Sequence, residues 1–356
     1  MNTLRHAKWM AERGHVVNLF CVAGTPLHKE GQMCDIGMFT VKRNKKNFDF
    51  KSAYKLSKTL KELKTEIIWF RDKRDLATIG LSKSFCNGKL KVLYQQAMQI
   101  GVVKTHLLHT LRFKKIDAWV TPLHYMADQV KNKTRFDHSK IHIVPLAIDV
   151  EDFNKKAYGK TEARQKFNLE ENDLVVGIIG RIDPHKAQQF VKDTVVELQK
   201  TYPEMKLLIV GNKTEGEWQE YYDTLRDDIE LNHQNKSVQM FPFMGDVKSF
   251  YNAIDIFVMA SAKETFGMVT IEAMMAGKII AGTNTCGTLE LLNNEEFGYY
   301  FVPNDIKTLK EALGKILSNR SEAEKKAIAA QCYAKGNFTK EIECHKIEEI
   351  LESLTK

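Results

Sequence analysis

The second half of the chain alternates short apolar runs with longer amphipathic stretches. The apolar runs predict buried strands at 174–179, 206–211, 238–242, 255–260, 278–282 and 299–302. Between them, 186–200 and 215–231 have helical periodicity, and further helices are expected at 321–334 and 338–354. This alternation indicates an α/β domain with a parallel sheet that is covered by helices on both faces.

The first half shows the same alternation less clearly. Strands are expected at 15–22, 38–41, 65–70, 90–94, 118–121 and 142–145, and helices at 2–13, 51–64 and 123–131. A turn-rich stretch at 148–153 predicts a domain boundary near residue 149. We therefore expect one α/β domain over 1–149, a second over 150–320, and C-terminal helices over 321–356.

Composition narrows the class of protein. Hydrophobic residues make up 43% of the chain and charged residues 28%, as in an ordinary soluble globular protein. No apolar run reaches the ~20 residues that a membrane-spanning helix needs, and the first residues do not form a secretory signal. The six cysteines contain no C-x-x-C pair, which favours free thiols in a reducing compartment. The expected location is the cytoplasm.

Charge is distributed unevenly along the chain. Residues 1–150 hold 27 Lys and Arg against 12 Asp and Glu, whereas the remainder holds 26 against 33. A basic first half favours an anionic acceptor or peripheral contact with an anionic membrane surface at its inner face. Nucleic acid is not expected as a partner, because the basic region lacks interleaved aromatics and a recognised motif. The lysine-rich helix at 51–64 is either a surface helix packed on its own sheet, which we favour, or a membrane-docking element.

Two cations follow the strand at 174–179. Arg181 and Lys186 lie five residues apart in Gly-Arg-Ile-Asp-Pro-His-Lys, between a strand end and a helix start. Arg can supply a bidentate fork and Lys a point charge, so the pair can converge on one pyrophosphate. Taken alone, two surface cations are more often simply solvated.

Two carboxylates flank a helix start after the strand at 255–260. Glu264 and Glu272 are separated by seven residues that include a Phe-Gly step. Backbone amides at a helix start favour anions. With helical rise throughout, the two carboxylates would lie roughly 12 Å apart, which is about the reach from the sugar to the ribose of a nucleotide-sugar.

The order and spacing of these segments resemble the retaining glycosyltransferases of family 4 type, or glycosyl transferases group 1. The resemblance covers about residues 170 to 318. It implies the GT-B fold: two Rossmann-like domains whose parallel sheets face a central cleft. It also implies that the last helix packs back on the first domain.

The resemblance assigns roles to particular residues. Arg181 and Lys186 would neutralise the leaving diphosphate, Glu264 would hold hydroxyls of the donor sugar, and Glu272 would hold the ribose. The implied catalytic residues are Arg181, Lys186 and Glu264, and the implied donor-binding residues are Gly180, Gly245, Val247, Thr265, Phe266, Gly267, Met268, Glu272 and Thr288. No cofactor is expected, and no metal either, because the chain contains no Asp-x-Asp triplet.

The chain departs from the family pattern at several points. Ala187 stands where the family usually has Gly, and Gln96 stands near the position of an acceptor-side His, for which His124 and His109 are alternatives. The family also has a strand and a Gly-rich loop before the first helix. We therefore expect that the first strand of the domain over 1–149 lies upstream of residue 1.

The predicted function is transfer of a sugar, with retention, from a UDP- or GDP-linked donor to a glycan or lipid-linked acceptor, in cell-envelope polysaccharide synthesis. Two alternatives remain: a sugar-nucleotide epimerase or phosphorylase on the same plan, and an N-terminally truncated fragment that binds nucleotide but is inactive.

Overall fold

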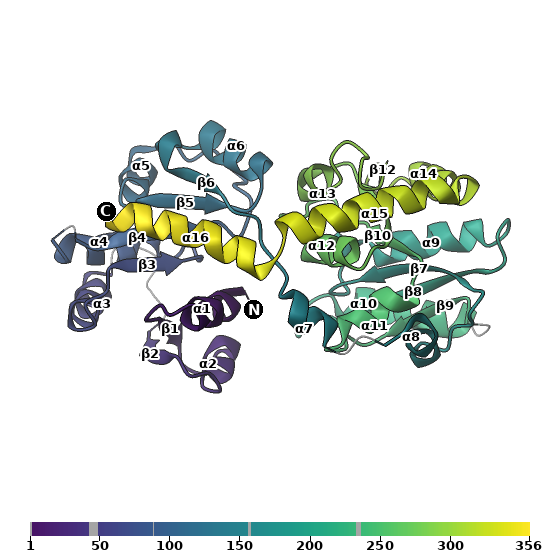
Figure 1. Cartoon of the computed structure of the whole chain (residues 1–356), viewed down its shortest axis with the longest axis horizontal. Helices are drawn as coiled ribbons and strands as arrows, with labels where there is room; N and C mark the ends of the chain where they lie inside the picture. Colours follow the sequence, from purple (N-terminus) through teal and green to yellow (C-terminus); the bar gives the residue numbers. More distant parts are fainter. Residues whose placement is uncertain (1, 43–48, 88, 156–157, 233–235) are drawn as a thin grey trace. The chain divides into compact units, whose positions relative to one another are not determined.

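The computed structural model describes residues 2–42, 49–87, 89–155, 158–232 and 236–356. The chain divides into two compact units (Figure 1). The first combines Met1–Pro145 with Lys340–Lys356, and the second is Leu146–Thr339. The division after Pro145 falls four residues before the predicted boundary at 149.

The second unit is built on a six-stranded parallel sheet in the order β12-β11-β10-β7-β8-β9. Its strands are β7 (Leu174–Ile179), β8 (Met205–Val210), β9 (Val238–Phe241), β10 (Ile256–Met259), β11 (Ile279–Thr283) and β12 (Tyr299–Phe301). From β7 the chain proceeds to β8 and β9 on one side, and then returns to place β10 on the other side of β7. The strand order therefore reverses between β7 and β10, as in doubly wound nucleotide-binding domains.

Helices cover both faces of this sheet. They are α7 (Val150–Asn154), α8 (Lys160–Lys166), α9 (Gln188–Leu198), α10 (Gln219–Asn232), α11 (Val247–Ala253), α12 (Met268–Met275), α13 (Cys286–Leu291), α14 (Ile306–Ser318) and α15 (Arg320–Asn337). Val176 and Ile178 of β7 belong to a core shared with α9, α10 and α14. Gly177 faces the opposite way, and a Cβ there would lie 2.5 Å from Ile254, just after α11.

The first unit contains two separate parallel sheets. One pairs β1 (Asn18–Val22) with β2 (Gly37–Val41), and the other has the order β3-β4-β5-β6. The latter strands are β3 (Ile67–Phe70), β4 (Lys91–Gln95), β5 (Ala118–Thr121) and β6 (Ile141–Ile143). The helices are α1 (Asn2–Glu12), α2 (Pro26–Gly31), α3 (Phe50–Glu62), α4 (Leu76–Phe85), α5 (Leu107–Phe113) and α6 (His124–Lys133).

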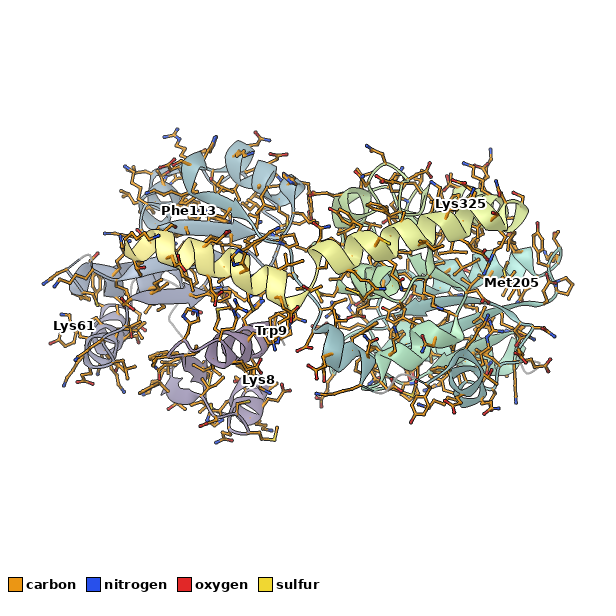
Figure 2. All side chains as sticks on the ribbon, in the orientation of Figure 1. Lys8, Trp9, Lys61, Phe113, Met205 and Lys325 are labelled. Carbon is orange, nitrogen blue, oxygen red and sulfur yellow. The ribbon has the colours of Figure 1, made fainter. Side chains whose placement is uncertain are left out.

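The last helix, α16 (Lys340–Thr355), belongs to the first unit, where it packs on α1. His6 lies 2.7 Å from Glu343 in a buried contact. Arg13 donates two hydrogen bonds to Glu348, at 2.7 and 2.5 Å. An aromatic and basic cluster surrounds these contacts, since Trp9, labelled in Figure 2, is buried and lies 4.8 Å from the Arg5 guanidinium.

Candidate functional site

Two of the residues predicted from the sequence, Lys186 and Glu264, meet at the point where the strand order reverses. β7 and β10 are neighbours in the sheet, and their carboxyl ends lead into the loops that carry Arg181 and Glu264. Lys186, from the first loop, lies 2.6 Å from a carboxylate oxygen of Glu264, from the second. Ligands of doubly wound sheets bind in this crevice. This ion pair, between residues 78 positions apart, therefore marks the candidate site.

The loop after β7 is held by its own backbone and by Asp183. The amide of Gly180 donates to the carbonyl of Val210 at 3.0 Å. Asp183, 2% exposed, accepts from the amide of His185 and begins a 3-10 turn over Pro184–Lys186. Ala187 follows with φ 58°, in the left-handed region, and α9 begins directly after it. The substitution of Ala for Gly therefore leaves the helix start intact, as expected, although a Cβ in this conformation is strained.

Arg181 is the exposed cation of the site. Its side chain is 63% exposed, and its nearest polar neighbours are Thr214 at 3.5 Å and Asp183 at 3.7 Å. Both distances exceed those of a strong charge-assisted hydrogen bond. The guanidinium fork can therefore turn to an anionic ligand at low cost, whereas Lys186 is already engaged with Glu264.

The loop after β10 leads into a helix whose start is shaped by glycine. Gly267 caps α12 with φ 93°, a conformation that a side chain rarely adopts. The first turn of α12 leaves backbone amides for a ligand. Thr270, in that turn, has a buried hydroxyl with no hydrogen-bond partner among the described residues. The sequence analysis had not singled out Thr270.

The structure places the other predicted residues of this loop in the same segment. Thr265 and Phe266 precede the cap, and Met268 is the first residue of α12. The Phe266 side chain is buried against Phe338, with ring centroids 6.0 Å apart, so only its backbone is left for a ligand. Since helix geometry begins only at Met268, the estimate of 12 Å between the two carboxylates, which assumed helical rise throughout, does not apply.

Glu272 is oriented by a residue that the sequence analysis missed. The Tyr251 hydroxyl lies 2.9 Å from a Glu272 oxygen and 3.0 Å from the carbonyl oxygen of Val269, so its single proton is shared between these two acceptors. Tyr251 is fully buried, and this burial raises its pKa well above the usual value, so the hydroxyl stays protonated and can donate. Tyr251 belongs to α11, which follows Gly245 and begins at Val247. The loop that carries the predicted donor-binding residues Gly245 and Val247 is therefore joined to Glu272 through α11.

The loop before α13 approaches the Glu264 segment at close range. The amide of Gly287 donates to the carbonyl of Glu264 at 3.1 Å. A Cβ at Gly287 would lie 2.9 Å from the carbonyls of Thr265 and Phe266, so glycine permits this approach. The neighbouring Thr288 is fully buried, and its hydroxyl has no hydrogen-bond partner among the described residues. Such a buried hydroxyl requires an explanation, and a bound ligand supplies one.

An open groove lies beside Arg181 within the second unit. It has a volume of about 500 Å³ and is lined by Arg181, Asp183, His185, Glu217 and Trp218. This volume falls within the range of small-molecule sites. The groove gives a ligand held by Arg181 room to extend over the 3-10 turn.

The acceptor-side candidates lie in the first unit. Gln96 is 2% exposed; its amide oxygen accepts from the Trp119 indole at 2.9 Å and its amide nitrogen donates to the Met98 carbonyl at 2.9 Å. These contacts indicate a structural role. His124 is exposed and is the first residue of α6, which follows the carboxyl end of β5. A role in acceptor binding stays a prediction for Gln96 and for His124 and His109.

No group of three or more metal-ligating side chains occurs within the described ranges. None of the helices of those ranges is long and apolar enough to cross a membrane.

Solved structures share this architecture over nearly the whole chain. A glycosyltransferase from Rickettsia africae superposes with a TM-score of 0.87 and 20% identity, covering 99% of this chain and 94% of that one. HepE from Anabaena, in complex with UDP, superposes with a TM-score of 0.84 and 18% identity, covering 99% and 95%. The predicted GT-B fold is confirmed.

The match to a known protein family lies within the second unit. Residues 159–331 match the family described as glycosyl transferases group 1, and this stretch of the chain belongs to it. CapM, a capsular polysaccharide biosynthesis glycosyltransferase from Staphylococcus aureus, is 26% identical over 207 residues, which are 57% of this chain and 53% of that protein. LpsB, a lipopolysaccharide core mannosyltransferase from Rhizobium meliloti, is 24% identical over 216 residues, 60% and 61%. The chain thus matches between half and two thirds of the length of these relatives, and the predicted resemblance to glycosyl transferases group 1 is confirmed over residues 159–331.

Proposed function

We propose that the protein is a retaining glycosyltransferase that transfers a sugar from a nucleoside-diphosphate sugar to a glycan or lipid-linked acceptor in cell-envelope polysaccharide synthesis. The observation that carries the proposal is the Lys186–Glu264 pair at the reversal point of the sheet, with Arg181 exposed on the same loop as Lys186. UDP is the first donor nucleotide to test, because HepE is described in complex with UDP. GDP is the second.

In this proposal the two cations act on the leaving diphosphate. Arg181 offers two parallel N–H donors, and Lys186 offers a point charge. When a phosphate takes part of the Lys186 interaction, a Glu264 oxygen is released and can accept a hydroxyl of the donor sugar. Fixed charges of this kind stabilise the negative charge that develops as the bond to the sugar breaks.

The remaining groups position the donor. The amides at the start of α12 and the buried hydroxyls of Thr270 and Thr288 are suited to phosphate oxygens. Glu272, held by Tyr251, accepts ribose hydroxyls. The departing phosphate takes the proton of the acceptor hydroxyl as the new glycosidic bond forms, so no nucleophile or metal from the protein is needed.

The proposed class of acceptor rests on the descriptions of two relatives and on the positive charge of the first half of the chain. CapM and LpsB are described as enzymes of capsular polysaccharide and lipopolysaccharide core synthesis. The basic first half of the chain suits an anionic or lipid-linked glycan, and we propose that the protein works in the cytoplasm at the inner face of a membrane.

Nucleotide binding tests the site directly. We expect UDP or GDP to bind by calorimetry, and Arg181→Ala or Lys186→Ala to weaken that binding about 10- to 100-fold, since each removes a charge-assisted interaction. Lys310→Ala is the matched control, because Lys310 forms a 2.9 Å ion pair with Glu197 elsewhere in the same unit. Equal affinity in all three variants would refute the assignment.

Assays of product formation then distinguish a transferase from the alternative functions. A transferase releases nucleotide from labelled nucleotide-sugars only when an acceptor glycan is present. Interconversion of the donor sugar without an acceptor indicates an epimerase, and use of inorganic phosphate as acceptor indicates a phosphorylase. Binding of nucleotide with no turnover across a panel of donors and acceptors indicates an inactive fragment.

A further inference from the structure

A cluster of exposed apolar side chains lies in the segment between β4 and β5 of the first unit. Six side chains within 98–111 are between 49% and 69% exposed: Met98, Val102, Val103, Leu107, Leu108 and Leu111. We call these six residues the apolar patch. Soluble proteins rarely gather so many large apolar side chains on one short exposed segment unless it contacts a partner or a membrane.

The apolar patch is held in place by the unit beneath it. The amide of Ile100 donates to the Gln129 side chain at 2.8 Å, and Lys133 donates to the Ile100 carbonyl at 2.7 Å. At the other end, Phe113 is 6% exposed and belongs to the core with Trp119. Because both ends are anchored, the apolar side chains between them are displayed outward by the fold.

The charge around the patch has one sign. Residues 98–115 contain four cations (Lys104, Arg112, Lys114 and Lys115), two histidines and no carboxylate. The two nearest carboxylates along the chain are already paired, Asp117 with Lys83 and Asp128 with Lys131. The segment that carries the patch therefore has a net positive charge, which we call its basic rim.

We propose that this apolar patch docks the protein on an anionic lipid surface. Apolar side chains with a basic rim match both parts of a lipid leaflet, because the side chains enter the acyl boundary while the cations meet the anionic headgroups. This patch lies outside α3, the lysine-rich helix that the sequence offered as a membrane-docking element. Ala53 and Leu60 of α3 are buried within the unit, and α3 exposes two large apolar side chains, Phe50 at 59% and Tyr54 at 64%, against six in the apolar patch.

Docking through the apolar patch would also serve the proposed reaction. The segment begins where β4 ends, at the carboxyl edge of the parallel sheet, where α/β domains bind their ligands. A membrane held there brings lipid-linked acceptors to that edge. The docking itself does not depend on the proposed function, because it rests on the surface of the first unit alone.

Vesicle co-sedimentation of the whole chain tests the apolar contribution. We expect binding to vesicles of phosphatidylcholine with phosphatidylglycerol, and Leu107→Ser/Leu111→Ser should weaken it about tenfold or more, since each leucine loses its apolar transfer free energy. Leu231→Ser/Ile328→Ser is the matched control, because these side chains are 73% and 63% exposed in the second unit. Loss of binding in the control pair, or full binding in the patch variant, would overturn the proposal.

The charge contribution has its own pair of variants. Lys114→Glu/Lys115→Glu should weaken binding to anionic vesicles about tenfold or more, at about 1 kcal/mol for each lysine near the surface. Lys55→Glu/Lys61→Glu on α3 should leave it close to wild type; Lys61 is labelled in Figure 2. Binding should also fall as ionic strength approaches about 1 M, where charges are screened beyond about 3 Å.

Two further outcomes would contradict the proposal, and a third measurement is a control for damage to the nucleotide site. Equal binding to pure phosphatidylcholine would contradict the anionic preference. A dimer in solution that Leu107→Ser/Leu111→Ser dissociates would assign the patch to a second copy of the chain. Unchanged UDP affinity in every variant would separate a docking defect from damage to the nucleotide site.

Discussion

Tyr251 shows how one buried side chain sets the geometry of the candidate site. Its hydroxyl lies within hydrogen-bond distance of a Glu272 oxygen, at 2.9 Å. We expect Tyr251→Phe to lower the free energy of unfolding by about 1–2 kcal/mol, because the part-buried carboxylate of Glu272 loses a hydrogen bond. Affinity for UDP should fall about three- to tenfold, the loss that follows when a hydroxyl acceptor is no longer held in position. Urea denaturation and calorimetry measure the two effects.

Tyr221→Phe is the control for this residue. The Tyr221 hydroxyl accepts from the amide of Gln189 at 3.0 Å, at the start of α9, and touches neither carboxylate of the site. This variant should lose stability without losing nucleotide affinity. If Tyr251→Phe and Tyr221→Phe lowered UDP affinity equally, Tyr251 would have no positioning role.

At the scale of elements, Glu348 of α16 pairs with Arg13 and His15, which follow the end of α1. Hydrogen bonds from Arg13 are the largest cause that lowers the pKa of Glu348 from 4.5 to about 2. A hydrogen bond from His15 makes a smaller contribution in the same direction. This pair therefore stabilises the first unit above about pH 4.5, and its contribution is lost as the pH falls from about 4.5 towards about 2. Glu348→Gln should cost less than about 1 kcal/mol at pH 7, since both side chains are partly exposed.

The pH dependence distinguishes this pair from its neighbours. Unfolding of Glu348→Gln, followed by circular dichroism between pH 2 and pH 5, should show a shallower loss of stability than the wild type. Glu349→Gln is the control. Glu349 lies on the same helix, and its ion pair with His345, at 3.3 Å, is exposed to solvent. Parallel acid curves for the wild type and Glu348→Gln would contradict the prediction.

The sequence predicted the elements of the second unit more closely than those of the first. Strands such as β7 and β10 are buried on both faces, so their apolar runs are continuous and their ends are sharp. Three helices of the first unit, α2, α4 and α5, were not predicted. α2 is six residues long, α4 is apolar without a helical period, and α5 exposes its leucines, so none shows an amphipathic pattern.

The site was predictable where it follows from topology. Loops after neighbouring parallel strands meet at one edge, which is why Arg181, Lys186 and Glu264 could be grouped from the sequence. Tyr251 and Thr270 could not, because a tyrosine or threonine in a helix has no spacing that marks it as a ligand holder. The two hydrogen bonds that occupy Gln96 likewise depend on packing around Trp119, which the sequence does not specify.

At the scale of the whole molecule, the second unit has one sheet, the first has two, and each unit has a buried core of its own. The candidate nucleotide site uses residues of the second unit only. A ligand stabilises the structure that it binds by about 2.7 kcal/mol at 100 times its dissociation constant. We therefore expect UDP at that concentration to slow the exchange of the slowest amides of the second unit about 100-fold, while the slowest amides of the first unit stay unchanged.

Hydrogen exchange read by mass spectrometry measures this difference in one experiment. Peptides from β7, β10 and α12 report the second unit, and peptides from β4 and α16 report the first. Arg181→Ala is the control, since it should remove the protection in the second unit at the same UDP concentration. Equal slowing of both sets would mean that the two units unfold together. In that case the division of the chain into two cores would describe its geometry but not its stability, and a ligand of either unit would stabilise the other.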